Sequence, residues 1–226
     1  MTFSLVGRCA RTGMLGAVVT TSSISVGSRC SHARAGIGAA LTQHRTDPRL
    51  GPLALDLLAH GFSAPEAMQA VVAATPHRHW RQLALINAAG RTAVYSGANV
   101  RAEHGEAQGR DCASIANIVR SAALPQAMVS AFEASPERPL ACRLLDALAA
   151  GEAAGGEYQP VTSAALIVVD RESFPYADLR VDDHEQPIAE LARLWAKYAP
   201  EAHAYVIRAV DPEAAVPPSG MKLTPT

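Results

Sequence analysis

The sequence predicts an α+β fold in which two antiparallel sheets lie face to face with helices on their outer surfaces, a four-layer α/β/β/α sandwich. Its segments follow one another as strands, two helices, strands, two helices, strands and a helix, which argues against a doubly wound parallel sheet. The 226 residues are 49% hydrophobic, enough to bury a sizeable core, and no linker or internal repeat divides them. We therefore expect one domain over residues 1–210, followed by a flexible tail over residues 211–226.

The first strands surround a polar loop. Residues 2–8 and 15–22 are rich in β-forming side chains and are predicted to pair as a hairpin around the turn signal Arg11-Thr12-Gly13. Residues 23–34 are predicted to form a loop rich in Ser, Arg and Gly. Residues 35–43 follow as a third strand, whose small side chains predict close packing against another layer.

Two helices are predicted next. The first has a helical stripe that Gly61 can end, made of Leu50, Leu53, Ala54, Leu57 and Leu58. The second begins at a capping box in which Ser63 is followed three residues later by Glu66.

The rest of the chain repeats this order. Strands are predicted at residues 82–87, 92–96 and 113–117, then a helix beginning near Pro125 and another over residues 139–150. Two more strands are expected at residues 163–170 and 177–181, and an amphipathic helix at 187–198. Residues 203–210 fit either a strand or a helix.

Composition excludes several classes of function. The net charge of −1 and the aromatic content of 5% argue against a nucleic-acid-binding surface, so we expect no nucleic-acid partner. No stretch approaches the ~20 apolar residues of a membrane helix, and the N-terminus lacks a secretory pattern. The four cysteines form no CxxC pair, so we expect free thiols, a cytoplasmic protein, and neither a metal site nor a cofactor.

Thr2 is the strongest candidate for chemistry. It follows the initiator methionine, which cells usually remove before a small residue, and it opens the first predicted strand without a flexible leader. A terminal α-amine has a pKa of about 8, so a desolvated one is partly neutral near neutral pH. One residue would then supply both the nucleophilic hydroxyl and the base that activates it. Thr2 would use that hydroxyl to attack a carbonyl.

A resemblance supports this hypothesis. The segments MTFSLVGR, TGMLGAVV, SVGS, ARAGIGAALTQ, GRDCASIANIV and DLRVDDH resemble a bacterial Ntn-hydrolase-like family, domain-of-unknown-function family ten-twenty-eight, over residues 2–198. The resemblance implies the Ntn-hydrolase type of sandwich and a threonine nucleophile, but no substrate. Where that family has Q-G-N, this chain has Ile115-Ala116-Asn117, so any role of the glutamine is lost and the asparagine is retained.

Several polar residues are candidates for the rest of the site. Asn117 ends a predicted strand and is the first candidate for an oxyanion donor, although an Asn there also caps strand ends. Substrate-binding candidates lie at the end of the third strand and in the loop that the hairpin brings near Thr2: Gln43, Ser22, Ser23, Ser28, Arg29 and Arg34. Arginine there would bind a carboxylate, unless the pair is a solvated surface feature.

A second polar cluster follows the last predicted strand. Arg180, Asp182, Asp183 and His184 would position the Thr2 amine or the substrate, with Asp183 and His184 as the catalytic members. The alternative is structural: the aspartates cap the next helix and pair with Arg180.

We therefore expect a hydrolase that cleaves an amide-like C–N bond in a small, acidic metabolite such as an amide or ureido acid, and that forms a homodimer or larger homo-oligomer. Two alternatives stay open. One is a non-catalytic ligand-binding or scaffold protein that keeps the fold. The other is an enzyme that processes a cyclic amide or imine through Asp183 and His184.

Overall fold

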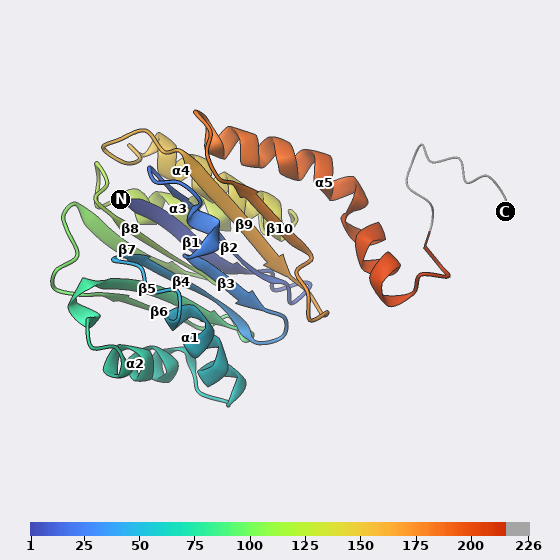
Figure 1. Cartoon of the computed structure of the whole chain (residues 1–226), viewed down its shortest axis with the longest axis horizontal. Coiled ribbons are helices and arrows are strands. Elements are labelled where there is room, and N and C mark those ends of the chain that lie inside the picture. Colours follow the sequence, from blue (N-terminus) through green and yellow to red (C-terminus); the bar gives the residue numbers. More distant parts are fainter. Residues whose placement is uncertain (216–226) are drawn as a thin grey trace.

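The computed structural model describes residues 1–215, which form two antiparallel sheets and five α-helices (Figure 1). The larger sheet has the strand order β10 (Ala177–Val181), β9 (Ser163–Val169), β2 (Leu15–Thr21), β1 (Thr2–Arg8), β8 (Cys112–Asn117) and β7 (His104–Gly109). The smaller has the order β3 (Ser31–Arg34), β4 (Gly38–His44), β5 (Arg81–Asn87) and β6 (Thr92–Ser96). The α+β class with two antiparallel sheets is therefore confirmed. Most of the expected tail lies outside the described residues.

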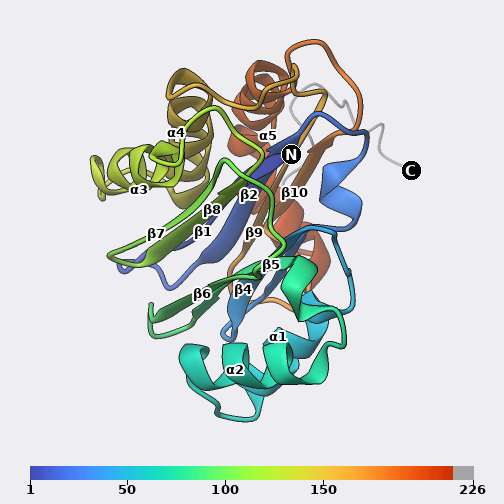
Figure 2. The same cartoon turned by 90° about the vertical axis from the view of Figure 1, so that its left-hand side faces the viewer.

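The helices cover the outer faces of the sheets (Figure 2). Over the six-stranded sheet lie α3 (Leu124–Glu133), α4 (Leu140–Ala153) and α5 (Pro187–Val210), and over the four-stranded sheet lie α1 (Leu50–Ala59) and α2 (Ala64–Ala74). The predicted capping box of Ser63 and Glu66 opens α2. The buried side of α1 is Leu50, Ala54, Leu55 and Leu58, whereas Leu53 of the predicted stripe is exposed.

Strand alternation divides the core into layers. In β1, Phe3 and Leu5 pack under α3 and α4, whereas Val6 packs between the two sheets. The layer between the sheets also holds Val19 of β2 and Ile115 of β8. Thr2 and Ser4 share the face of Val6, so the first residue of β1 points toward the space between the sheets.

The β1–β2 hairpin forms as predicted, with Gly13 in the left-handed region at a φ of +80°. The expectations for residues 23–37 were wrong. The segment 23–34 is not only loop, because its last residues form β3, and the next strand begins at Gly38 rather than Ala35. The strand β7 was not predicted. The segment 203–210 is helical and continues α5, which contains Pro200.

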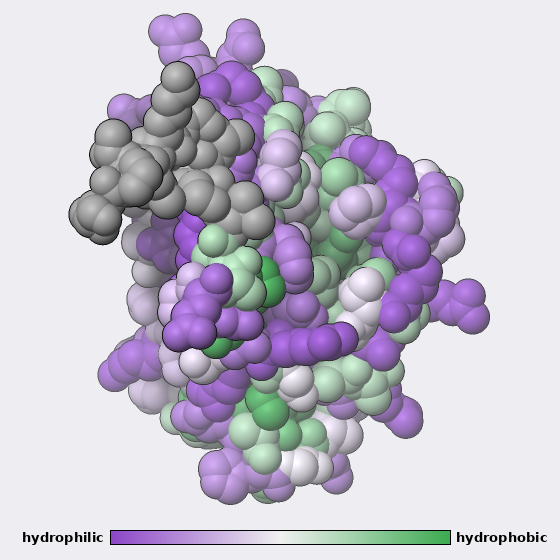
Figure 3. Space-filling model, turned by 90° about the vertical axis from the view of Figure 1, so that its right-hand side faces the viewer, coloured by the Kyte–Doolittle hydropathy of each residue, from purple (hydrophilic) through white to green (hydrophobic). Residues whose placement is uncertain are grey.

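The second half of α5 extends beyond the sheet in Figure 1 and leaves Tyr205 and Val210 exposed. The face on the right-hand side of Figure 1 mixes hydrophilic and hydrophobic residues (Figure 3). Among residues 1–215, no helix is both long enough and apolar enough to cross a membrane.

Candidate active site

One end of the space between the sheets gathers buried polar side chains. Thr2 pairs with Asn117 across β1 and β8, and register partners on one face have Cβ atoms about 4.5–5.5 Å apart. Thr21 lies on the same inner face, at the end of β2, and the three residues are at most 6% exposed. Two neighbouring strands thus hold the side chains of Thr21 and Asn117 on either side of Thr2.

The Thr2 hydroxyl lies among polar partners in this buried position. Its Oγ1 donates to the carbonyl oxygen of Met1 and lies 3.4 Å from Oγ1 of Thr21. The Thr21 hydroxyl donates to the same Met1 carbonyl at 2.5 Å. Burial lowers the pKa of the terminal amine, which Met1 carries here, despite the nearby carboxylate of Glu157. Met1 therefore occupies the space directly beside the Thr2 hydroxyl.

Glu157 is the acidic residue whose charge acts on this terminus. It follows Gly155 and Gly156, whose φ angles of +122° and +58° favour glycine and turn the chain from α4 toward the site. The carboxylate is 5% exposed, and its Oε2 accepts a 3.0 Å hydrogen bond from the Ser22 amide. Its Oε1 is buried without a hydrogen-bond partner. Burial raises the pKa of Glu157 to about 7, although the Ser22 hydrogen bond and the terminal amine oppose the shift.

This raised pKa predicts a specific pH dependence of stability. A carboxyl whose pKa is higher in the folded state stabilises the fold fully below its unfolded pKa of about 4.5, and the contribution disappears as the pH rises through about 7. Glu157→Gln should therefore be more stable than the wild type at pH 8, by on the order of 1–3 kcal/mol, and should lack the decline over this window. Urea unfolding at several pH values measures the free energy of unfolding of both proteins. The same decline in the variant would contradict the assignment, and Glu152→Gln, on exposed α4 surface, is the control.

Behind Thr2, side chains of both sheets form a fully buried amide network. Gln82 Oε1 accepts hydrogen bonds from Gln43 Nε2 at 2.7 Å and Asn117 Nδ2 at 3.1 Å. Gln43 also accepts from the Ser4 hydroxyl at 2.7 Å and lies 3.5 Å from the Thr2 carbonyl oxygen, as donor. Asn117 Oδ1 is buried and has no partner. The network fixes Asn117 while leaving one amide hydrogen and its carbonyl oxygen uncommitted.

The structure brings some predicted site residues together and separates others. Asn117, Gln43 and Ser22 lie around Thr2. Ser23 lies one residue further on, where its hydroxyl accepts a hydrogen bond from Arg29 at 2.8 Å.

Ser28 and both arginines make contacts of their own. The Ser28 hydroxyl and the Arg29 guanidinium bond to carbonyl oxygens within their loop. Arg34 lies on β3 and pairs with Asp56 of α1 at 2.8 Å. These contacts hold the loop and a helix, and they direct no arginine toward Thr2.

The second polar cluster lies at the end of the strands where Thr2 lies, but on the far side of β2 and β9. Arg180 pairs with Asp178 at 2.9 Å, and the Asp182 carbonyl accepts from the Ser25 amide. The His184 amide donates to the Thr162 carbonyl at 2.8 Å, and its Nδ1 accepts from the Gln186 amide. At ~4.8 Å per strand, three strand spacings separate β10 from β1, so the cluster is ~15 Å from Thr2.

An open cavity of about 470 Å³ borders this cluster and is lined by Thr162, Asp183, His184 and Glu185. All four cysteines are free, and within residues 1–215 no group of three or more His, Cys, Asp or Glu residues is arranged to hold a metal.

Sequence reasoning missed three residues of the site: Thr21, Gln82 and Glu157. Thr21 could have been found from the hairpin, because the strand predicted at 15–22 had to end beside Thr2. Gln82 offered a weaker signal, a polar residue at the start of an apolar strand. Glu157 lies in a loop that forms an isolated β-bridge with Val119, and no sequence pattern connects it to Thr2.

The fold and the site define an α+β protein whose second residue is a buried threonine facing the space between two antiparallel sheets. The chain belongs to the family of unknown function DUF1028, which matches residues 2–191.

Two solved structures are similar to it. A Silicibacter pomeroyi protein of the same family aligns with a TM-score of 0.82 at 28% identity, over 88% of this chain and 86% of that one. The ancestral β-subunit Anbu of Yersinia bercovieri aligns with a TM-score of only 0.41 at 12% identity, over 98% of this chain and 100% of that one. No curated protein matches the chain.

Proposed function

We propose that the protein is an N-terminal-threonine hydrolase, that its layers form the α/β/β/α sandwich of the Ntn-hydrolase type, and that it cleaves an amide-like C–N bond in a small molecule. The observation that carries the proposal is the Thr2 hydroxyl, buried at the start of β1 between Thr21 and Asn117. A buried nucleophile placed on a strand is held more rigidly than one on a loop. Removal of Met1 both frees the amine and vacates the space beside the hydroxyl.

The proposed reaction uses Thr2 twice. The Thr2 amine accepts the hydroxyl proton as Oγ1 bonds to the substrate carbonyl carbon, and the carbonyl oxygen becomes an oxyanion. The amine then gives its proton to the leaving nitrogen as the C–N bond breaks. Water attacks the resulting ester by the same route, releases the acid and restores the hydroxyl.

The neighbouring groups support the two charges that develop. The uncommitted amide hydrogen of Asn117 and a backbone N–H are the proposed oxyanion donors, each worth on the order of 3 kcal/mol when well placed. The free Oε1 of Glu157 is the proposed acceptor for the protonated Thr2 amine. This pairing gives the amine a fixed orientation and gives Oε1 of Glu157 a partner.

The size of the substrate follows from the space that Met1 fills. Its side chain lies beside Ser22, with Sδ 3.9 Å from the Ser22 hydroxyl, so a methionine-sized group fits there. The charge of Arg45 acts on the same terminus and favours an acidic substrate. Arg45 thus takes the role expected for Arg29 and Arg34, which bind other groups. We propose a small amide or ureido acid.

Covalent labelling tests this proposal without a known substrate. We expect a β-lactone to add one acyl group per chain, and peptide mapping to locate it on Thr2. Pre-treatment with an amine-selective acylating reagent should abolish the labelling. Adducts spread over surface lysine or cysteine residues, with none on Thr2, would contradict it.

The cavity beside Asp183 and His184 favours one alternative, an enzyme that processes a cyclic amide or imine at this open site. Such an enzyme would need neither the Thr2 hydroxyl nor removal of Met1.

A further inference from the structure

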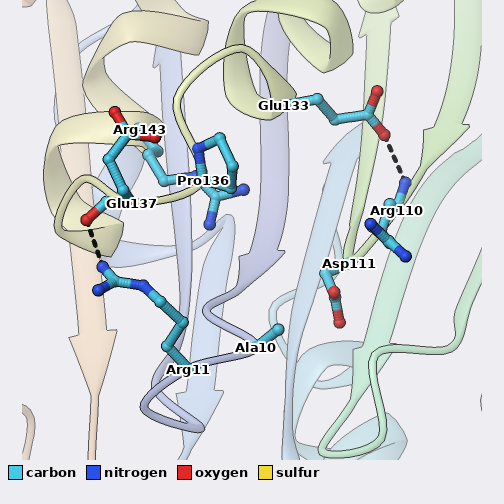
Figure 4. A pocket seen from close by; sticks show the side chains of 8 residues that line it. All are labelled: Ala10, Arg11, Arg110, Asp111, Glu133, Pro136, Glu137 and Arg143. Carbon is cyan, nitrogen blue, oxygen red and sulfur yellow. Dashed lines mark hydrogen bonds between the residues drawn. The ribbon is translucent and has the colours of Figure 1, made fainter.

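A larger cavity lies at the opposite end of β1. It has a volume of about 810 Å³ and is bordered by the β1–β2 turn, the β7–β8 turn and the loop between α3 and α4 (Figure 4). The seven residues of β1 separate it from Thr2 by ~20 Å. No step of the proposed reaction uses this cavity.

Arg143 of α4 is the buried charge in the wall of the cavity, with 5% of its surface exposed. Its Nε donates to the Phe132 carbonyl oxygen at 3.0 Å, and the guanidinium carbon lies 3.9 Å from the Phe132 ring centroid. These contacts fix the plane of the guanidinium and leave both Nη groups uncommitted. Within residues 1–215, no carboxylate lies within ion-pair distance of it.

The carboxylates of Asp111 and Glu133 have other partners and form no ion pair with Arg143. Asp111 is already paired with Arg8 at 2.9 Å. Glu133 is exposed at the rim, where its Oε1 accepts a 2.5 Å hydrogen bond from the Arg110 amide.

Two buried thiols, Cys9 and Cys112, also act on the charge of Arg143. Against the effect of burial, hydrogen bonds with Thr12 lower the pKa of Cys9. Burial raises the pKa of Cys112 to about 12, so the thiol stays uncharged. Burial also lowers the pKa of Arg143 itself, although the charge of Asp111 opposes the shift. A buried cation with a free fork in a cavity wall favours an anion that reaches it.

We propose that this cavity binds a small monocarboxylate whose carboxylate meets the Nη fork of Arg143 and whose apolar body lies along Ala10 and Pro136. The planar guanidinium matches a carboxylate in a two-pronged contact. The lining carries three carboxylates, Asp111, Glu133 and Glu137, against three arginines, Arg11, Arg110 and Arg143. The cavity therefore has no net positive charge that would favour a ligand with several negative charges, such as phosphate.

Calorimetric titration of the full chain with valerate tests this site, with valeramide as the uncharged control at constant ionic strength. We expect saturable 1:1 binding of valerate, at least about tenfold weaker binding of valeramide, and weaker binding of inorganic phosphate. Arg143→Met should reduce the valerate affinity at least about tenfold. Equal binding of the acid and the amide would overturn the proposal.

Two further variants keep the test decisive. Arg143→Lys can still donate to the Phe132 carbonyl but lacks the planar fork, so we expect it to fold and to bind valerate several-fold more weakly. Thr2→Ala should bind valerate like the wild type, because Thr2 lies outside this cavity. If valerate instead bound beside Thr2 as a product does, Thr2→Ala would lose affinity for it. Arg193→Met, on exposed α5 surface, is the matched control. Unchanged binding by folded Arg143 variants would overturn the assignment.

Discussion

Thr2→Ala is expected to lower kcat for amide hydrolysis by at least about 1,000-fold while the protein keeps its fold, because the substitution removes the atom that forms the covalent bond. Alanine at position 2 still permits removal of Met1, so the variant changes the nucleophile and not the processing. Turnover of a panel of small amides and ureido acids, followed by release of ammonia or amine, measures the effect.

Thr2→Ser is the matched control, because it keeps a hydroxyl on the same residue as the amine. We expect it to retain at least about a hundredth of the wild-type rate and to accept the same lactone label. Full activity in Thr2→Ala would show that Thr2 is not the nucleophile. If Asp183→Asn lost activity at the same time, the cyclic-amide alternative at the second cluster would replace the proposed function.

Gln82→Leu is expected to destabilise the protein by about 3 kcal/mol or more. Gln82 is fully buried. Its side chain accepts hydrogen bonds from Gln43 and Asn117 and donates to Ser96 and to the carbonyl of Ala116. Leucine has a similar size, so the loss comes mainly from buried polar groups left without partners rather than from a cavity. Urea unfolding, monitored by circular dichroism, gives the free energy of unfolding.

The same change should affect catalysis beyond stability. Because Gln82 holds Asn117, the folded variant should show a lower kcat with a smaller change in KM. Gln126→Leu on exposed α3 surface is the control and should change the free energy of unfolding by less than about 0.5 kcal/mol. Stability equal to the wild type in Gln82→Leu would show that the amide network does not support the site.

The sequence was sufficient for elements whose apolar residues follow one period. β1 and β2 are buried on both faces because helices cover one face and the second sheet the other, and their β-forming composition predicted them. β7 was missed because it is an edge strand with the sequence HGEAQG, half exposed, and only its pairing with β8 identifies it. Pro200 hid the continuation of α5, since proline inside a helix usually ends it.

The candidate site was predictable only where a residue ends a recognisable strand. Thr2, Gln43 and Asn117 lie at strand ends, and the sheet arrangement brings those ends together. Arg34 was expected near Thr2 as part of a loop, but β3 instead carries it beside α1 and its partner Asp56. Glu157 depends on a tertiary position set by two glycines with positive φ, which one sequence does not reveal.

The central claim is that the working chain begins at Thr2, whose amine draws the proton from its own hydroxyl. Intact-protein mass spectrometry of the purified, active protein tests it most directly. We expect a mass lower than that of the encoded chain by one methionine residue, with Thr2 as the first residue in N-terminal sequencing. A fully active protein that retains Met1 would contradict it, because the amine would then be part of a peptide bond and unable to act as a base.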